Sequence, residues 1–376
     1  MMRIAYIINH LGQSGVNQVV ADLVTMFTKH GHQCVIYYLK DCANPMDYLC
    51  QTVRTGKKWN GQDTYDVIHA HGLGPMLYVA MHRHEIIKCQ GNMHRPLFVT
   101  TLHCYCFQDL PSLYGWAKGG MMACAYLFST LWQDKVVCLS QDMMRYYSRW
   151  VKQGKLSYVY NTRILPELSS VTFNSEDKIL VDKLEAWHRQ GFQVIGMNGV
   201  LIRRKGVDLI LQALQLLNAG CDKYRLVLIG DGQDKEELVA LSETLGLQGM
   251  VLFAGHRQDA YRFLPHYDVL AMPSHSEGFP LSLLEAAAYG KRVVVSELPI
   301  VKECFAGESR QELPNGLEVV AFKIDANVEE TVKRLSEAVR EAMKEKNMGV
   351  RLHSRYENEY APDLFAQHYL RVYNEI

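Results

Sequence analysis

Short apolar runs alternate with longer amphipathic segments along most of the chain. In segment 16–30, Val19, Val20, Leu23 and Phe27 recur at the spacing of one helix face. The pattern predicts strands at 3–9, 35–39, 66–69, 97–102, 135–139, 193–197, 225–229, 250–254, 269–272, 292–295 and 317–322. Continuous apolar strands that alternate with helices are typical of parallel sheets covered by helices on both faces. The predicted fold class is therefore α/β, with doubly wound, Rossmann-like parallel sheets.

The alternation occurs twice and breaks between residues 161 and 191. Pro166, a Ser-Ser pair and a polar stretch precede a helix expected at about 178–188, which indicates a linker. A chain of 376 residues is long enough for two domains. We therefore expect one domain over 1–165 and another over 190–354, followed by a C-terminal segment, 355–376. Two doubly wound sheets that face each other would place a ligand in the cleft between them.

The composition is that of an ordinary globular protein, with 48% hydrophobic and 21% charged residues. Lys+Arg and Asp+Glu both number 40, which argues against a dedicated nucleic-acid binder. The first 165 residues hold 16 basic and 9 acidic side chains, and the remaining 211 residues hold 24 basic and 31 acidic side chains. The basic half favours an anionic partner, such as a phosphate-bearing acceptor or a membrane surface. Chance patterning of solvated faces explains the asymmetry equally well.

The cysteines and the apolar stretches indicate the cellular compartment of the protein. None of the ten cysteines forms a Cys-x-x-Cys pair, and no Cys/His set has zinc-finger spacing. Segment 1–8 has the pattern of a strand rather than of a signal peptide. The longest low-charge stretch, 119–133, is too short to span a bilayer. We expect a cytoplasmic protein whose cysteines are reduced and form no zinc finger.

The most informative stretch follows the expected strand 269–272. It contains Ser-Glu277-Gly-Phe-Pro-Leu-Ser-Leu-Leu-Glu285-Ala, and a helix is expected to begin near 279–281. The first N–H groups of a helix and its dipole can bind a diphosphate. Carboxylates before and within the helix can accept hydrogen bonds from sugar hydroxyls. Taken alone, the two glutamates are more simply explained as a helix cap and a surface ion pair.

This stretch resembles the paired-glutamate signature of the retaining glycosyltransferases of family 4, which have the two-domain GT-B fold. The resemblance covers nearly the whole chain and is most specific in 190–300. It implies that Glu277 contacts the hydroxyls of the donor sugar and that Glu285 binds the ribose of the nucleotide. It also implies that the diphosphate lies along Gly278, Phe279, Pro280 and Leu281, of which Pro280 has no N–H to donate.

The family resemblance implies an enzyme that moves a hexosyl unit from a UDP- or GDP-sugar to an acceptor hydroxyl with retention of configuration. It needs no metal or cofactor, because cations and a helix N-terminus stabilise the leaving diphosphate. Acceptor binding is expected in 1–165 and donor binding in 190–354. A helix at 361–373 is expected to cross back to the first domain. The acceptor would be a glycan or a lipid-linked glycan in surface polysaccharide or glycolipid assembly.

A second motif follows the expected strand 193–197. It runs from Gly199 through three consecutive cations, Arg203, Arg204 and Lys205. Lys205 matches a lysine of the family and is expected to stabilise the leaving group. The family usually has Arg directly after the first glycine, where this chain has Val200, so Arg203 or Arg204 must supply the second cation. A solvated basic turn is the simpler alternative.

Further residues are assigned from the resemblance alone. Arg257 follows a strand and is expected beside the nucleobase, whereas the role of Glu303 stays open. Gly12 and Gly15 lie between the first strand and the first helix, and in the family this loop reaches the donor phosphates. A lone Gly-x-x-Gly is weak evidence for a dinucleotide site, so a dehydrogenase is disfavoured.

Histidines end two neighbouring strands of the first domain. His103 follows Thr100-Thr-Leu and aligns with a family histidine beside the transferred sugar, so we count it with Glu277 and Lys205 as catalytic. A buried structural histidine is the alternative. For His71 the two interpretations are equally good, and Asp109 is a fallback polar group.

Aromatic and basic residues are mixed in 143–155, and an apolar segment, 114–132, precedes them. Together they could rest on an anionic bilayer, which would make the protein peripheral to the cytoplasmic face of a membrane. A helix with one buried face is an equally good explanation. For the whole chain, the alternatives are a sugar-nucleotide epimerase, a glycosidic phosphorylase and a non-catalytic nucleotide-sugar binder.

Overall fold

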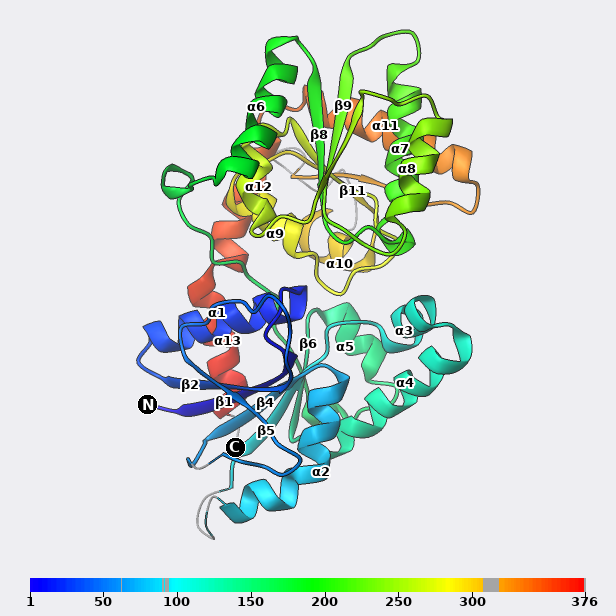
Figure 1. The fold of residues 1–376 in the computed structure, drawn as a ribbon. Coiled ribbons are helices and arrows are strands. Elements are labelled where there is room, and N and C mark those ends of the chain that lie inside the picture. Colours follow the sequence, from blue (N-terminus) through cyan, green and yellow to red (C-terminus); the bar gives the residue numbers. More distant parts are fainter. Residues whose placement is uncertain (62, 90, 92–94, 307–317, 375–376) are drawn as a thin grey trace. The chain divides into compact units, whose positions relative to one another are not determined.

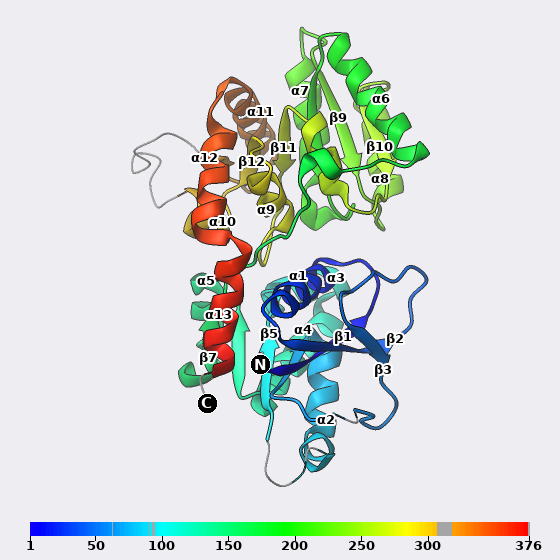
Figure 2. The ribbon, with the colours of Figure 1, turned by 90° about the vertical axis from the view of Figure 1, so that its left-hand side faces the viewer.

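The computed structural model describes residues 1–61, 63–89, 91, 95–306 and 318–374. Its contacts divide the chain into two compact units (Figures 1 and 2). Unit 1 comprises Met1–Ile164 with Tyr360–Ile376, and unit 2 comprises Leu165–Glu359.

Unit 1 is built on a seven-stranded parallel sheet with the order β3-β2-β1-β4-β5-β6-β7. Its central strands are buried because every side chain faces either the helices above or those below. The strands are β1 (Arg3–His10), β2 (Gln33–Lys40), β3 (Gln51–Arg54), β4 (Val67–His71), β5 (Leu97–Thr101), β6 (Lys135–Cys138) and β7 (Leu156–Tyr158). The helices are α1 (Gly15–Lys29), α2 (Leu73–Cys89), α3 (Cys106–Tyr114), α4 (Trp116–Ser129), α5 (Gln141–Tyr147) and α13 (Pro362–Asn374).

The C-terminal helix α13 belongs to unit 1. Figure 2 shows it, in red, in the same unit as α1, and the two helices are in contact. The rings of Phe27 and Tyr373 lie 5.3 Å apart, centroid to centroid. Apolar and aromatic side chains of α13, such as Phe365 and Tyr369, are buried in the core of this unit.

Unit 2 is built on a six-stranded parallel sheet with the order β10-β9-β8-β11-β12-β13. The strands are β8 (Gln193–Asn198), β9 (Tyr224–Ile229), β10 (Val251–Gly255), β11 (Val269–Met272), β12 (Val293–Ser296) and β13 (Val320–Phe322). The helices are α6 (Ser175–Arg189), α7 (Val207–Asn218), α8 (Lys235–Thr244), α9 (Leu281–Ala288), α10 (Pro299–Val301), α11 (Val328–Lys344) and α12 (Met348–Arg355). Leu209, Leu226 and Leu335 are among the side chains that fill the core between α7, α11 and the sheet.

The predicted doubly wound α/β class is confirmed, and each predicted strand overlaps an observed one. Leu317, the first residue of the last predicted strand, lies outside the described residues. The pattern missed β3 and β7, whose short sequences form exposed or half-exposed edges of the sheet. Such edges lack the continuous apolar run that identifies a buried strand.

The segment expected to link the domains differs from the prediction. Helix α6 is part of unit 2, because Leu180, Leu184 and Trp187 are buried and because Asp177 pairs with Arg262. Residues 355–359 also belong to unit 2, so the chain returns to unit 1 at Tyr360 rather than at 355.

Candidate functional site

The loop between β11 and α9 carries the first of the two glutamates. Glu277 lies in this loop, and Pro280 is the N-cap of α9, with an extended backbone conformation. Proline suits this position because its ring fixes φ near the value found here and because the first turn needs no N–H from it. Glu285 lies in the second turn of α9 and is partly buried. Both glutamates therefore have the positions along the helix that the sequence predicts.

The cation motif forms a short turn beside this loop. Arg203–Lys205 make one turn of 3-10 helix after β8, and Gly206 then adopts a left-handed conformation, with φ of 67°. A Cβ atom at Gly206 would lie 2.0 Å from the carbonyl oxygen of Pro273. The His275 N–H donates to the carbonyl oxygen of Arg204 at 2.8 Å. Glycine therefore lets the cation turn and the β11–α9 loop pack backbone against backbone.

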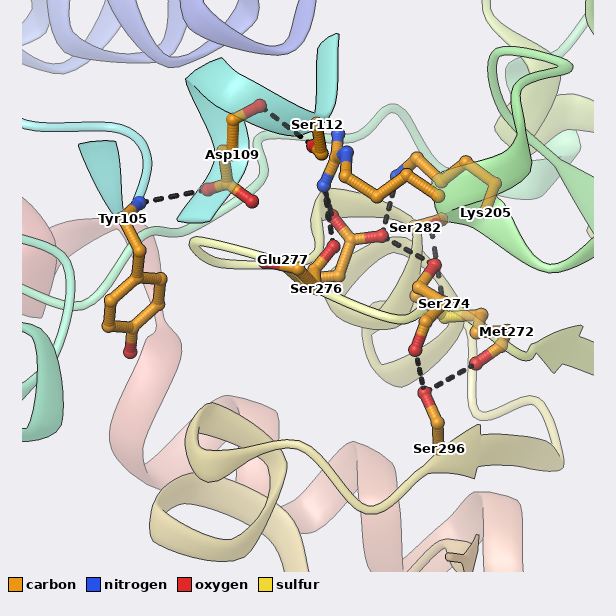
Figure 3. A network of polar contacts seen from close by, with 11 residues as sticks. Tyr105, Asp109, Ser112, Lys205, Met272, Ser274, Ser276, Glu277, Ser282 and Ser296 are labelled. Carbon is orange, nitrogen blue, oxygen red and sulfur yellow. Dashed lines mark hydrogen bonds and ion pairs between the residues drawn. The ribbon is translucent and has the colours of Figure 1, made fainter. Parts of the chain in front are cut away.

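Two cations and one hydroxyl lie beside the Glu277 carboxylate (Figure 3). Lys205 Nζ donates to Glu277 Oε1 at 2.5 Å, and Ser274 Oγ donates to the same oxygen at 2.7 Å. Arg204 lies 3.8 Å from the other oxygen and donates to the carbonyl oxygen of Ser276. Because only 9% of the Glu277 side chain is exposed, its charge has to be compensated by these partners.

Burial and charge act in opposite directions on Glu277. Burial alone would raise the pKa of its carboxyl group, but the charges of Lys205 and Arg204 and the hydrogen bonds from Lys205 and Ser274 outweigh burial. The pKa of Glu277 is therefore lowered, and the group is ionised at neutral pH. An anionic carboxylate can accept hydrogen bonds from sugar hydroxyls while it orients the Lys205 ammonium group.

Hydrogen bonds from Ser296 and Ser274, two residues not predicted from the sequence, hold the β11–α9 loop in place. Ser296, at the end of β12, donates its hydroxyl to the carbonyl oxygens of Ser274 and, at 3.4 Å, Met272 (Figure 3). Ser274 in turn donates to Glu277. The spacing of Ser274, three residues before Glu277, is the one signal in the sequence that could have identified it. Ser296 lies beside this loop only because β12 pairs with β11.

The structure shows which of Arg203 and Arg204 lies beside Glu277. Arg204 lies beside Glu277, and its buried Nε has no hydrogen-bond partner among the described residues. Arg203 is exposed, and its backbone N–H donates to Asp234. Val200, which replaces the usual family arginine, is 53% exposed. Arg204 is therefore the arginine placed to act with Lys205.

The backbone of Gly199 has open space on one side. Its φ of 154° suits glycine, and a Cβ atom built there would have no described neighbour within 4 Å. At the neighbouring strand end, a Cβ atom on Gly230 would lie 1.8 Å from the Gly199 carbonyl oxygen. Both glycines thus allow the ends of β8 and β9 to approach closely, and Gly199 leaves room on its other side.

Arg257 has a structural partner. Its Nε lies 3.3 Å from Oδ1 of Asp177, a buried carboxylate on α6 that also binds Arg262. This ion pair accounts for the orientation of Arg257, and its contact with a nucleobase stays a prediction. Glu303 lies in a π-helical turn, Lys302–Ala306, and its role also stays open.

In unit 1, His103 and His71 meet at the carboxyl ends of β5 and β4. His71 Nδ1 lies 3.0 Å from His103 Nε2. Only 1% of His71 is exposed, whereas His103 is partly exposed. Burial lowers the pKa of His103 to about 4 and that of His71 well below its usual value, so both imidazoles are neutral at pH 7. His103 is therefore placed to contact a ligand, and His71 is placed behind it.

The loop between β1 and α1 is held by its own polar groups. Gly15 opens α1, and Asn17 donates from its amide to the carbonyl oxygens of His10, at 2.6 Å, and Gly12, at 2.5 Å. The Gly12 N–H donates to the His10 ring. Asp109 is buried and accepts the Tyr105 N–H at the start of α3, as Figure 3 shows, so its contact is that of a helix cap.

Among the residues that the structure describes, no group of three or more His, Cys, Asp or Glu side chains is arranged to hold a metal ion. Likewise, none of the helices described in the structure has the length and the apolar character that crossing a membrane requires.

The sequence is similar to those of known glycosyltransferases. The family model described as "Glycosyl transferases group 1" matches residues 185–355. The O-antigen biosynthesis glycosyltransferase WclY of Escherichia coli is 28% identical over 321 residues, which are 81% of this chain and 82% of that protein. An N,N'-diacetylbacillosaminyl-diphospho-undecaprenol alpha-1,3-N-acetylgalactosaminyltransferase of Campylobacter jejuni is 29% identical over 175 residues, 46% of this chain and 42% of that protein.

Solved structures share the fold over the whole chain. Anabaena Alr3699/HepE, solved in complex with UDP and glucose, matches with a TM-score of 0.74 at 15% identity and full coverage of both chains. The sucrose-phosphate synthase of Thermosynechococcus elongatus matches with a TM-score of 0.74, also at 15% identity, and covers 100% of this chain and 99% of that one. These likenesses establish the GT-B fold. Residues 185–355 are thus similar to the glycosyl transferases group 1, and the chain is a glycosyltransferase.

Proposed function

We propose that this glycosyltransferase moves a hexosyl unit from a UDP- or GDP-sugar to a hydroxyl of a glycan or lipid-linked acceptor, with retention of configuration. The observation that carries the proposal is the contact of Lys205 and Arg204 with Glu277 just before α9. Cations, a carboxylate and the start of a helix at one place suit a sugar diphosphate, which has two anionic phosphates and neutral hydroxyls.

In the proposed reaction, the bond between the anomeric carbon and the β-phosphate oxygen breaks. The acceptor oxygen forms a new bond to the same face of the sugar, and its proton passes to the departing phosphate. Negative charge grows on the diphosphate, where Lys205 and Arg204 stabilise it. Glu277 orients Lys205 and accepts hydrogen bonds from the sugar hydroxyls. Glu285 binds the ribose, and His103 contacts the transferred sugar.

The cations lead us to propose a reaction that needs no metal. Lys205 and Arg204 supply positive charge where a metal ion would otherwise neutralise the leaving group. Transfer should therefore proceed at an unchanged rate in EDTA. A large loss of activity in EDTA that Mg²⁺ or Mn²⁺ restores would contradict this part of the proposal.

The relatives support the acceptor class. The name of WclY refers to O-antigen biosynthesis, and that of the Campylobacter jejuni relative refers to a diphospho-undecaprenol acceptor. The first name refers to a glycan, and the second refers to a lipid-linked sugar. We assign this chain the same class of acceptor and leave the linkage to experiment.

We also propose that unit 1 rests on an anionic membrane surface. Ala117, Met121, Cys124 and Phe128 are exposed and recur at helical spacing, so they form an apolar stripe along α4. Trp116, directly before the stripe, is 90% exposed. Lys118 is the only charged residue of α4. We call Ala117, Met121, Cys124 and Phe128 the α4 stripe.

The same unit also exposes a cation and an aromatic ring close to α3. Arg145 on α5 is 68% exposed and lies 3.6 Å from the Asp142 carboxylate. Trp150, which follows α5, packs against Phe107 of α3 with ring centroids 5.4 Å apart. Apolar residues flanked by Lys and Arg bind the interface of anionic bilayers. A lipid-linked acceptor would be met at such a surface.

A panel of nucleoside diphosphate sugars tests the main proposal. The true donor should raise the melting temperature, because a ligand that binds only the folded state stabilises it. In the absence of acceptor, the same donor should be hydrolysed slowly to free sugar and nucleoside diphosphate. Tight binding without hydrolysis or transfer would favour a non-catalytic binder, and conversion to an epimeric sugar nucleotide would favour an epimerase.

A further inference from the structure

The hydrogen bond between His71 and His103 requires one ring to donate and the other to accept. The two nitrogens lie 3.0 Å apart, and burial keeps both rings neutral at pH 7. A neutral imidazole carries one proton, either on Nδ1 or on Nε2. The direction of this one bond therefore determines the tautomer of both rings.

The far side of His71 decides the direction. His71 Nε2 is buried and has no hydrogen-bond partner among the described residues. If His103 donated, His71 would carry its proton on Nε2, as a buried N–H with no acceptor. Orphaned buried N–H groups are rarer than unpaired acceptors. The arrangement therefore favours His71 Nδ1–H as the donor and His103 Nε2 as the acceptor.

Packing holds the His71 ring in place. His69, two residues earlier on β4, lies 4.1 Å from it, centroid to centroid, and the Tyr6 ring of β1 lies 6.1 Å away. His69 is itself held at both nitrogens, by Tyr373 at 2.7 Å and Thr101 at 2.9 Å. The His71 ring is thus held directly by Tyr6 and His69. Through His69 it is also held by β5 and α13.

We propose that His71 is a positioning residue that holds His103 as the Nδ1–H tautomer, so that His103 presents a hydrogen-bond donor to the sugar. Among the described residues, His103 Nδ1 has no hydrogen-bond partner, and the ring is partly exposed. A donor there can bind a hydroxyl or ring oxygen of the sugar and cannot take a proton from the acceptor. The catalytic consequence rests on the proposed function, whereas the tautomer does not.

Nitrogen NMR of the protein labelled with [¹⁵N]histidine tests the tautomer directly. The His103 signals, assigned with His103→Asn, should show a protonated Nδ1 and an unprotonated Nε2. In His71→Leu this preference should be lost. In His71→Asn it should be kept, because the amide can donate from nearly the same place. Thr100→Val is the matched control, since it removes a buried hydrogen bond to Ala70 between the same two strands.

Turnover is measured on the same variants with the donor found in the sugar-nucleotide panel. His71→Leu should lower kcat about tenfold or more with a smaller change in KM for the donor, whereas His71→Asn should restore most of it. Thr100→Val should lower stability without this loss. A protonated Nε2 on His103 in the unmodified protein, or equal losses in all three variants, would overturn the proposal. If the tautomer is as inferred and His103→Ala, which has no side-chain donor, transfers sugar at the full rate, the assigned role of His103 fails and the tautomer stands.

Discussion

Lys205 Nζ lies 2.5 Å from Glu277 Oε1, although 72 positions separate the two residues in the chain. The contact joins the loop after β8 to the loop before α9, at the carboxyl ends of neighbouring strands. In open α/β sheets, ligands bind outside these ends. The pair therefore keeps a cation and a carboxylate in place before any donor arrives, which lowers the cost of organising the site during the reaction.

Replacing Lys205 by Met should remove the charge that stabilises the leaving diphosphate. We expect transfer to fall by about 10²–10³-fold, the range found when a single stabilising donor is lost. Initial rates over a series of donor concentrations give the measurement. Lys235→Met is the matched control, because Lys235 pairs with Asp231 at 2.9 Å at the surface of the same unit. Equal rates for the two variants would show that Lys205 does not act on the diphosphate.

Glu277→Gln should destabilise the protein in a pH-dependent way. The pKa of Glu277 is lowered in the folded state, so its ionised form adds stability above the ordinary pKa of about 4.5. That contribution is lost as the pH falls through the lower, folded-state pKa. Urea midpoints of the two proteins should therefore differ at pH 7 and converge in acid. A difference that stays constant from pH 7 down to pH 3 would contradict the ion pair.

Glu285→Ala should weaken donor binding, since we assign this carboxylate to the ribose hydroxyls. The stabilisation given by the true donor in a thermal-shift titration should fall, whereas Glu285→Gln should keep part of it. Glu337→Ala, on the exposed side of α11, serves as the control. If UDP or GDP binds the Glu285→Ala variant with unchanged affinity, the ribose assignment is wrong.

The sequence predicted the parts of the site that depend on order along the chain. The distances of Glu277 and Glu285 from the start of α9 follow from one strand and one helix, each with a clear apolar pattern. The sequence alone left open whether Arg203 or Arg204 acts with Lys205. That choice depends on the 3-10 turn and on Gly206 packing against Pro273, which are tertiary contacts.

Other parts were missed because their signal is spread over distant segments. Ser296 supports the loop before Glu277 only because β12 pairs with β11. The ion pair of Arg257 was also missed, because its partner Asp177 lies on α6, in the polar segment expected to be a linker. A polar segment such as α6 is recognised as part of a domain only when its few buried residues find their neighbours.

The α4 stripe should bind anionic vesicles. The double variant Met121→Asn/Phe128→Asn should lose most co-sedimentation with phosphatidylglycerol-containing vesicles, because two apolar side chains no longer enter the interface. The control is Ile179→Asn/Val350→Asn in unit 2, where both residues are 69% exposed, as Met121 is. Equal binding by the two double variants, or equal binding to vesicles of phosphatidylcholine alone, would contradict this assignment.

The buried ion pair of Asp22 and Arg163 should be the most sensitive point in unit 1. Arg163 Nη1 donates to Asp22 Oδ2 at 2.5 Å, and both side chains are less than 5% exposed. Asp22 lies on α1, and Arg163 lies where the chain is about to leave the unit, so the pair fastens that exit to the core.

Arg163→Met should leave the Asp22 charge without its partner and lower the free energy of unfolding by about 3–5 kcal/mol. Adding Asp22→Leu should recover much of this loss, because an apolar pair of similar volume no longer has to bury a charge. Urea unfolding of the single and double variants gives the comparison. A double variant as unstable as the sum of the two single variants would show that the residues act independently, and the exit of the chain would then have to be held by other contacts, such as the hydrogen bond from Thr162 to the carbonyl oxygen of Tyr360.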